Sequence, residues 1–279
     1  WCVLLSAVMV CSSCESVETS PEVVASSGSE PSTAPVWGEG PVPAVSDAGE
    51  QAPGGTGAGA SATPGQADPT PGAGNCDAGL VIDSPDPRDG ARALGLCRFV
   101  TEASGEPGVI DARYVSADGS RVLDDLRQVG LLDAFGVNPP LQGTRMLALS
   151  SGSARAPGQP GYSDNCGEYF SDGSDRWPPG YPRESSACPS APEAISLFDP
   201  AALQLRLRVP EDARAMSFRS NYFTFEYPSY ICSEYNDYFV TFVDPPAVGQ
   251  VDTNVVFDEE GNWISVNTSL LQVCSAGTH

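Results

Sequence analysis

Six widely spaced cysteines constrain this chain more than any other feature. No two of them form the closely spaced pair that structural zinc sites usually contain, so disulfide bonds made outside the reducing cytosol are predicted. Six cysteines allow 15 pairings. Short enclosed loops favour Cys76–Cys97, Cys166–Cys188 and Cys232–Cys274. The six residues, all within 76–279, are Cys76, Cys97, Cys166, Cys188, Cys232 and Cys274.

The first 14 residues are predicted to be a lipoprotein signal segment whose charged start would precede Trp1. Residues 3–10 form an apolar run, VLLSAVMV, that is far shorter than the roughly 20 residues needed to span a bilayer. Such a run is typical of the core of a secretory signal. Two serines precede Cys14, which favours it as the lipid-bearing residue. Cys11, which follows the bulkier Val10, is the alternative, and an ordinary cleaved signal with incidental cysteines is another.

Residues 15–75 are predicted to form a disordered acidic tether. Between residues 16 and 75 there are 9 prolines and 11 glycines, a share typical of disordered segments. The tether carries eight carboxylates and no basic residue. A flexible chain of this length spans about 40–45 Å on average, enough to hold a domain clear of a membrane.

Residues 76–279 are predicted to fold as one all-β domain. Asp86 as a cap and Pro87 at the first helical position indicate a short helix that runs to about Leu96. After the helix, apolar alternation and turn residues indicate a jelly-roll-like β-sandwich. Residues 156–192 would form a long loop clamped by Cys166–Cys188. Strands are predicted at 109–116, 145–150, 203–209, 216–227, 237–243, 254–257, 263–266 and 270–274, with a glycine turn at Gly261 and bulky core side chains at Phe218, Phe223, Phe225, Phe239 and Phe242.

Five stretches of this domain resemble the choice-of-anchor L family of bacterial surface proteins, especially its myxobacterial members. The resemblance covers about residues 76–275, and its motifs occur in order. It implies an exported domain joined to a cell-surface anchor, without a defined biochemical activity. Here the anchor is expected at the N-terminus, because no C-terminal sorting segment is visible before His279. The stretches are GTRMLALSSG at 143–152, FEYPSY at 225–230, YNDYF at 235–239, ALGLC at 93–97 and SVN at 265–267.

Charge and residue types exclude several functions. The formal net charge is -22, which disfavours nucleic acid as a partner. The chain has no lysine, and its one histidine is the last residue, His279. Schiff-base, P-loop, Ser-His-Asp and Cys-His chemistry are therefore not expected. A carboxylate pair of the kind that glycosidases use is the one catalytic device left, and no pair stands out.

Two groups of residues are candidate sites. Oxygen-bearing side chains around the predicted turn after residue 226 suit calcium, the one cofactor indicated, although turn hydrogen bonds would explain them equally. These are Glu226, Asn236, Asp237 and Asp244. Aromatic residues could form a rim that binds a glycan or a protein, or could instead pack in the core. These are Trp177, Tyr181, Tyr227, Tyr230 and Tyr235.

These features predict a lipid-anchored protein of the outer membrane or cell surface that works as an adhesion or binding module. Its partners would be the membrane, through the lipid, and an extracellular glycan or protein. A structural component of the envelope or matrix is the first alternative. A carboxylate-based glycan hydrolase is the second, and catalysis is not part of the main prediction.

Overall fold

The computed structural model is β-rich and describes residues 2–9 (backbone only), 76–136, 138–163, 170–185, 187–189, 196–224, 226, 230–246, 253–258 and 261–267. In these residues no helix is long and apolar enough to cross a bilayer. The strands are β1 (Cys2–Met9), β2 (Gly108–Val115), β3 (Val129–Leu132), β4 (Met146–Leu149), β5 (Ala201–Arg208), β6 (Tyr238–Asp244) and β7 (Ile264–Ser265). The helices are α1 (Pro87–Ala93) and the short 3-10 turns η1 (Glu102–Ser104) and η2 (Leu126–Gln128).

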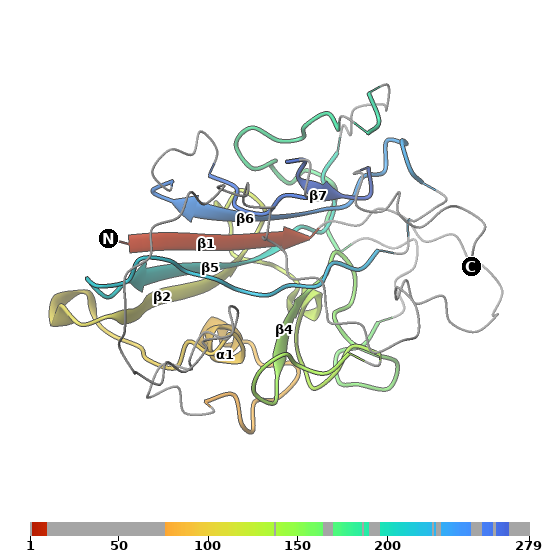
Figure 1. Cartoon of the computed structure of the whole chain (residues 1–279). Helices are drawn as coiled ribbons and strands as arrows, with labels where there is room; N and C mark the ends of the chain where they lie inside the picture. The colour runs from red at the N-terminus through yellow and green to blue at the C-terminus, as the bar shows by residue number, and fades with distance from the viewer. Residues whose placement is uncertain are drawn as a thin grey trace, which may run out of the picture. The chain divides into compact units, whose positions relative to one another are not determined.

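Five of the strands form one antiparallel sheet in the order β2-β5-β1-β6-β7, and β3 pairs with β4 in a second, two-stranded sheet. Figure 1 shows β6, β1, β5 and β2 side by side, with α1 and β4 on one side of them. The β-rich class predicted from the sequence is therefore confirmed.

Strand β5 contributes to two hydrophobic cores, one on each face of the sheet. Its buried leucines alternate with half-buried polar residues, as strand geometry requires. Leu203, Leu205 and Leu207 pack in the core that also contains Ala91 of α1. Ala202 belongs to the other core, whose large members are aromatic. These aromatic residues are Tyr181, Tyr238 and Trp263, with Trp177 and Phe242 packed against them.

Helix α1 confirms the capping prediction. The side chain of Asp86 accepts a hydrogen bond from the backbone N–H of Arg88 at 2.9 Å, and Pro87 is the first helical residue. The helix ends at Ala93, a few residues earlier than predicted. Gly95 has a φ of 79°, the left-handed conformation that commonly ends helices.

The predicted signal run occupies the middle of the sheet as β1. Its Cα register sets Ala7 opposite Leu203 on one side and Thr241 on the other. A short apolar run suits a buried strand as well as a signal, because periodicity alone does not separate the two. Its processing as a signal stays a prediction.

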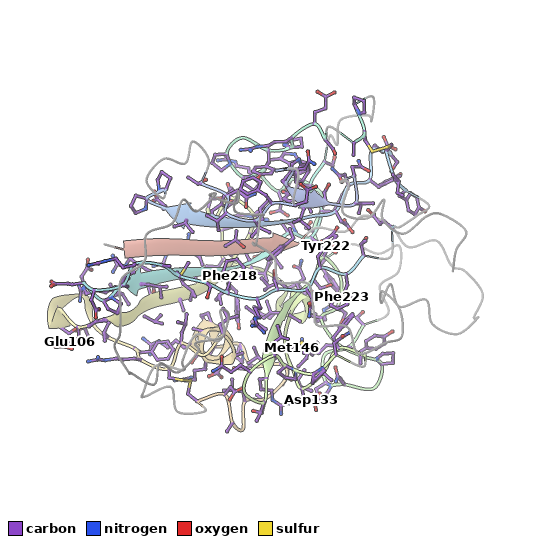
Figure 2. The ribbon with its side chains drawn as sticks, viewed as in Figure 1. Glu106, Asp133, Met146, Phe218, Tyr222 and Phe223 are labelled. Carbon is purple, nitrogen blue, oxygen red and sulfur yellow. A yellow bond between two sulfur atoms is a disulfide. The ribbon has the colours of Figure 1, made fainter. Side chains whose placement is uncertain are left out.

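Two strand predictions differ from the structure. Residues 216–224 form no strand, and Met216 and Phe218 are largely exposed, so Phe218 does not supply core as predicted. Figure 2 labels Phe218 on this segment. Its immediate neighbours in sequence offer it little room: β2 and β1 take both edges of β5, and β1 takes one edge of β6. Residues 254–257 contribute only isolated bridges, at Asn254 and Phe257.

The predicted turn at Gly261 is present. Gly261 adopts the predicted positive φ, at 84°. Phe225 and the strand expected at 270–274 lie outside the described residues.

The disulfides confirm one predicted pair and overturn the other two. Cys76 bonds to Cys97, as predicted. Cys188 bonds to Cys232, so the pairings Cys166–Cys188 and Cys232–Cys274 are wrong. Proximity in sequence misled the prediction, because the loop that carries Cys188 packs against the segment before β6 and not on itself. Cys166 and Cys274 lie outside the described residues.

We predict that replacing Cys188 and Cys232 together with alanine lowers the free energy of unfolding by about 4 kcal/mol, from the chain entropy of the loop they close. The two residues are 44 apart in sequence. The matched control is the Cys76→Ala, Cys97→Ala double variant, whose loop of 21 residues gives a loss of about 3 kcal/mol. Urea denaturation measures both. Peptide mapping of the oxidised protein that finds Cys166 linked to Cys188 would contradict the structure.

Candidate functional site

Glu226 and Asp237 lie close together in the interior, and the contact between them uses the backbone of Asp237. Each is 1% exposed. The backbone N–H of Asp237 donates to Glu226 Oε2 at 3.4 Å, and the carbonyl oxygen of Asp237 accepts from the hydroxyl of Tyr222 at 2.9 Å. This pair therefore joins the segment after β5 to the start of β6 and lies away from solvent.

Asn267 connects the same region to the disulfide. Its Oδ1 accepts from the backbone N–H of Cys232 at 2.7 Å, and its backbone N–H donates to Asn236 Oδ1 at 3.1 Å. Its carbonyl oxygen accepts from the hydroxyl of Ser185 in the long loop. The cluster around Asn267 thus holds three loops together, which is the turn-stabilising role weighed against calcium binding.

The four predicted calcium ligands do not converge. Asp244 ends β6 and is exposed, whereas Asp237 precedes the start of β6. Asp237 and Asp244 are seven residues apart along extended strand, which separates their Cα atoms by roughly 23 Å. Asn236 Oδ1 already accepts from Asn267. Within the described residues, no three His, Cys, Asp or Glu side chains are grouped to hold a metal ion.

The predicted aromatic rim divides into separate parts. Tyr181 is 7% exposed and stacks on Tyr238 with ring centroids 5.7 Å apart. Trp177 stacks on the same ring, also at 5.7 Å. Both therefore belong to the aromatic core. Tyr230 and Tyr235 contact each other edge to face at 5.4 Å, and Tyr227 lies outside the described residues.

The GTR motif at 143–145 is structural. The carboxylate of Asp77 accepts hydrogen bonds from the backbone N–H groups of Thr144 and Arg145. Gly143 has a φ of 75°, and a Cβ there would collide with that carboxylate. The motif therefore fixes the start of β4 to the segment before α1.

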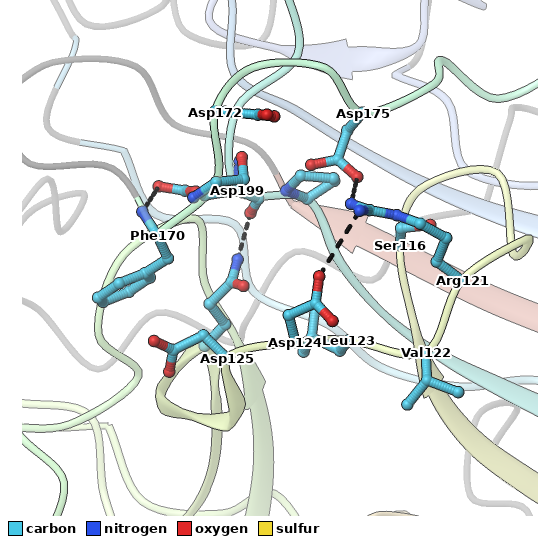
Figure 3. A pocket seen from close by; sticks show the side chains of 13 residues that line it. Ser116, Arg121, Val122, Leu123, Asp124, Asp125, Phe170, Asp172, Asp175 and Asp199 are labelled. Carbon is cyan, nitrogen blue, oxygen red and sulfur yellow. Dashed lines mark hydrogen bonds and ion pairs between the residues drawn. The ribbon is translucent and has the colours of Figure 1, made fainter.

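An open hollow with a volume of about 300 Å³ lies elsewhere in the described part of the chain, near the start of β5. Figure 3 shows that its walls come from the turn after β2, the loop at 170–175 and the residues just before β5. A second hollow of about 320 Å³ shares Ser116 and Arg121 with it. The first is lined by Ser116, Arg121, Val122, Leu123, Asp124, Asp125, Gln128, Phe170, Ser171, Asp172, Asp175, Asp199 and Pro200.

A hairpin turn positions Arg121 in this hollow. The backbone N–H of Ser116 donates to the carbonyl oxygen of Arg121 at 3.0 Å, and Gly119 supplies the positive φ of the turn. The guanidinium of Arg121 forms an ion pair with Asp175 and approaches Asp124 at 3.6 Å (Figure 3). The Asp175 side chain is 3% exposed and that of Arg121 is 51% exposed. The buried carboxylate of Asp175 thus fixes the guanidinium of Arg121, while about half of the Arg121 side chain stays exposed to solvent.

Asp199 fixes the inner wall. It has a φ of 51°, and its carboxylate accepts from the backbone N–H groups of Phe170 at 3.0 Å and Ser171 at 2.6 Å. Its carbonyl oxygen accepts from the side chain of Gln128. Burial raises the pKa of Asp199 above its ordinary range, against the opposing effect of the two backbone donors. Because its carboxylate is buried and hydrogen-bonded to the 170–171 backbone, Asp199 has a structural role in the wall of the hollow.

Phe170 and Asp125, which line the hollow, both contact Arg127, which lies behind them. The guanidinium of Arg127 lies 4.2 Å from the ring centroid of Phe170. Hydrogen bonds from the same guanidinium hold the pKa of Asp125 below its usual range. The wall therefore presents fixed polar groups beside an aromatic ring.

The sequence did not reveal this hollow. Its charged residues come from positions 121–125, 172–175 and 199, each unremarkable in a domain with 28 acidic residues. The adjacent pair Asp124-Asp125 and the spacing of Asp172 from Asp175 were the available signals. Neither identifies a site without knowledge of the fold.

We predict a pH signature from Asp199. A carboxyl whose pKa is raised by folding favours the folded state below its unfolded pKa, and this contribution is lost as pH rises through the folded pKa. The stability of the unchanged protein relative to Asp199→Asn should therefore be greatest below about pH 4 and fall as pH rises above it. Urea denaturation across pH measures the difference. Asp133→Asn, at an exposed carboxylate, is the control, and an equal pH trend there would refute the assignment.

Comparison with known proteins does not extend this description. No protein-family model, no curated protein and no solved structure matches the chain. The resemblance to the choice-of-anchor L family therefore stays a proposal.

Proposed function

We propose that this chain is an exported, lipid-anchored module of the cell envelope that binds glycans in the hollow around Arg121. In this proposal the domain is a jelly-roll-like sandwich related to the choice-of-anchor L family, and it performs no catalysis. The observation that carries the binding proposal is the guanidinium of Arg121, held by Asp175 at the wall of an open hollow of about 300 Å³.

The chemistry of the hollow suits neutral sugars. Carboxylates accept hydrogen bonds from hydroxyl groups, and a guanidinium donates to them. The Phe170 ring can contact a sugar only through the face or edge that Arg127 does not cover. Acidic ligands are disfavoured, because Arg121 is the one cation among the residues that line the hollow and Asp124, Asp172 and Asp175 line it as well. A volume of this size is at the lower end for a small-molecule site and fits one or two sugar rings.

Export is supported by the disulfides. Cys76–Cys97 and Cys188–Cys232 join residues far apart in sequence, and such bonds persist in oxidising compartments. Calcium is not carried into the proposal, since Asp244 lies at the far end of β6 from Asp237 and Asn236 Oδ1 already accepts a hydrogen bond from Asn267.

We predict that Arg121→Ala weakens glycan binding by about tenfold or more, the equivalent of about 1.4 kcal/mol. The donor is lost, and Asp175 is left buried without its cation. A glycan array followed by calorimetry on the best ligand measures the loss. Arg98→Ala is the matched control, because Arg98 forms an exposed ion pair with Glu106 away from the hollow. Equal binding by Arg121→Ala and the unchanged protein would reject the hollow as the site.

We predict that Cys14 carries the lipid. In a host that processes lipoproteins, metabolic labelling with a fatty acid should mark the unchanged protein and the Cys11→Ser variant, and should fail to mark Cys14→Ser. A functional signal start is added ahead of Trp1 for this test. Labelling that persists in Cys14→Ser and is lost in Cys11→Ser would move the anchor to Cys11.

A further inference from the structure

One short strand, β1, lies between β5 and β6 and pairs with both of them. β1 pairs through all eight of its residues with β5 and through six of them with β6. Figure 1 shows β1 lying between these two strands. Without β1, the facing backbone N–H and C=O groups of β5 and β6 would have no strand to bond.

Both faces of this position are covered by core. Leu205 of β5 is 1% exposed and lies in the core with α1, and Val240 of β6 is fully buried in the aromatic core. The occupant therefore completes a sheet that is packed on two faces. At register positions opposite Leu203, Leu205 and Leu207 it presents the apolar residues Ala7, Leu5 and Val3.

The same eight residues are the core of the signal segment in the proposed function, on which this inference rests. Processing at Cys14 removes them. β5 and β6 both run antiparallel to β1, so they run parallel to each other. To pair directly they would have to close one strand spacing of about 4.8 Å and shift the two cores with them.

We propose that the processed domain is a strand acceptor: the slot between β5 and β6 takes an extended apolar segment of six to eight residues donated by another envelope protein. The donor runs antiparallel to β5 and carries apolar residues at the positions of Val3, Leu5 and Ala7. Main-chain hydrogen bonds to two edges supply affinity, and the alternate side-chain positions supply selectivity, as in other cases of strand addition. In the unprocessed chain, β1 is the stand-in for this donor.

The test uses the whole chain, cut after folding. Cys2, Cys11 and Cys14 are changed to serine, and a specific protease site is placed between Gly54 and Gly55. After cleavage, the N-terminal piece is expected to co-elute with the domain in gel filtration. A labelled synthetic peptide of residues 2–9 with Cys2→Ser, added in excess, should displace the piece, bind saturably and raise the melting temperature of the emptied domain.

Hydrogen exchange locates the binding. Amides of β5 and β6 should exchange at least about tenfold faster in the emptied domain, and the peptide should restore the slow rate. The same peptide with Leu5→Pro is the matched control, because proline cannot occupy a central strand.

Three results would overturn the proposal: no peptide binding, equal binding of the proline peptide, or unchanged exchange in the emptied domain. Dimerisation of the emptied domain with protection of β5 and β6 would assign the slot to a second copy instead. Failure of fatty-acid labelling at Cys14 bears on the proposed function and leaves these outcomes unaffected.

Discussion

Strand β5 is the element on which the rest of the structure depends, because both of its edges and both of its faces are in use. β2 and β1 bond its edges, its leucines fill the core with α1, and Ala202 enters the aromatic core. The residues just before it, Asp199 and Pro200, line the hollow, and the turn after its neighbour β2 carries Arg121. The geometry of the candidate site therefore follows from the pairing of β5.

Away from the sheet, side-chain hydrogen bonds replace strand ladders. Asp77, Asp199 and Asn267 each accept hydrogen bonds from backbone groups of distant segments. The Cys188–Cys232 bond adds a covalent link in the same half of the domain. A region with few regular elements satisfies its buried polar groups in this way, since unbonded backbone groups in the interior are costly. Asp and Asn suit this role because their short side chains present fixed oxygens to loop backbone.

The sequence predicted the elements whose signals are local. Alternation located β2, β4, β5 and β6, and the Asp86-Pro87 cap located α1. It failed where the outcome depended on distant partners. The segment from 216 alternates bulky and polar residues but pairs with none of the described strands, and the partner of Cys188 depends on how two loops pack.

The candidate site illustrates the same limit. Glu226 and Asp237 do converge, because a short connection brings the two together. The hollow needs residues from three distant segments, and no spacing in the sequence signals it.

The hollow and the proposed slot both involve β5, but they suit different ligands. The hollow offers fixed charges and an exposed guanidinium to a polar ligand, whereas the slot offers unpaired backbone and two apolar cores to an extended chain. They are also close in register, because Ala201 pairs with Met9 and Asp199 stands two residues earlier. An occupant of the slot pairs with the first residues of β5, which directly follow the inner wall of the hollow. Any energetic coupling that results is reciprocal by linkage, so a glycan that fits the ordered wall also favours the donor strand. A module of this design would bind its ligand best once it is assembled with its partner in the envelope.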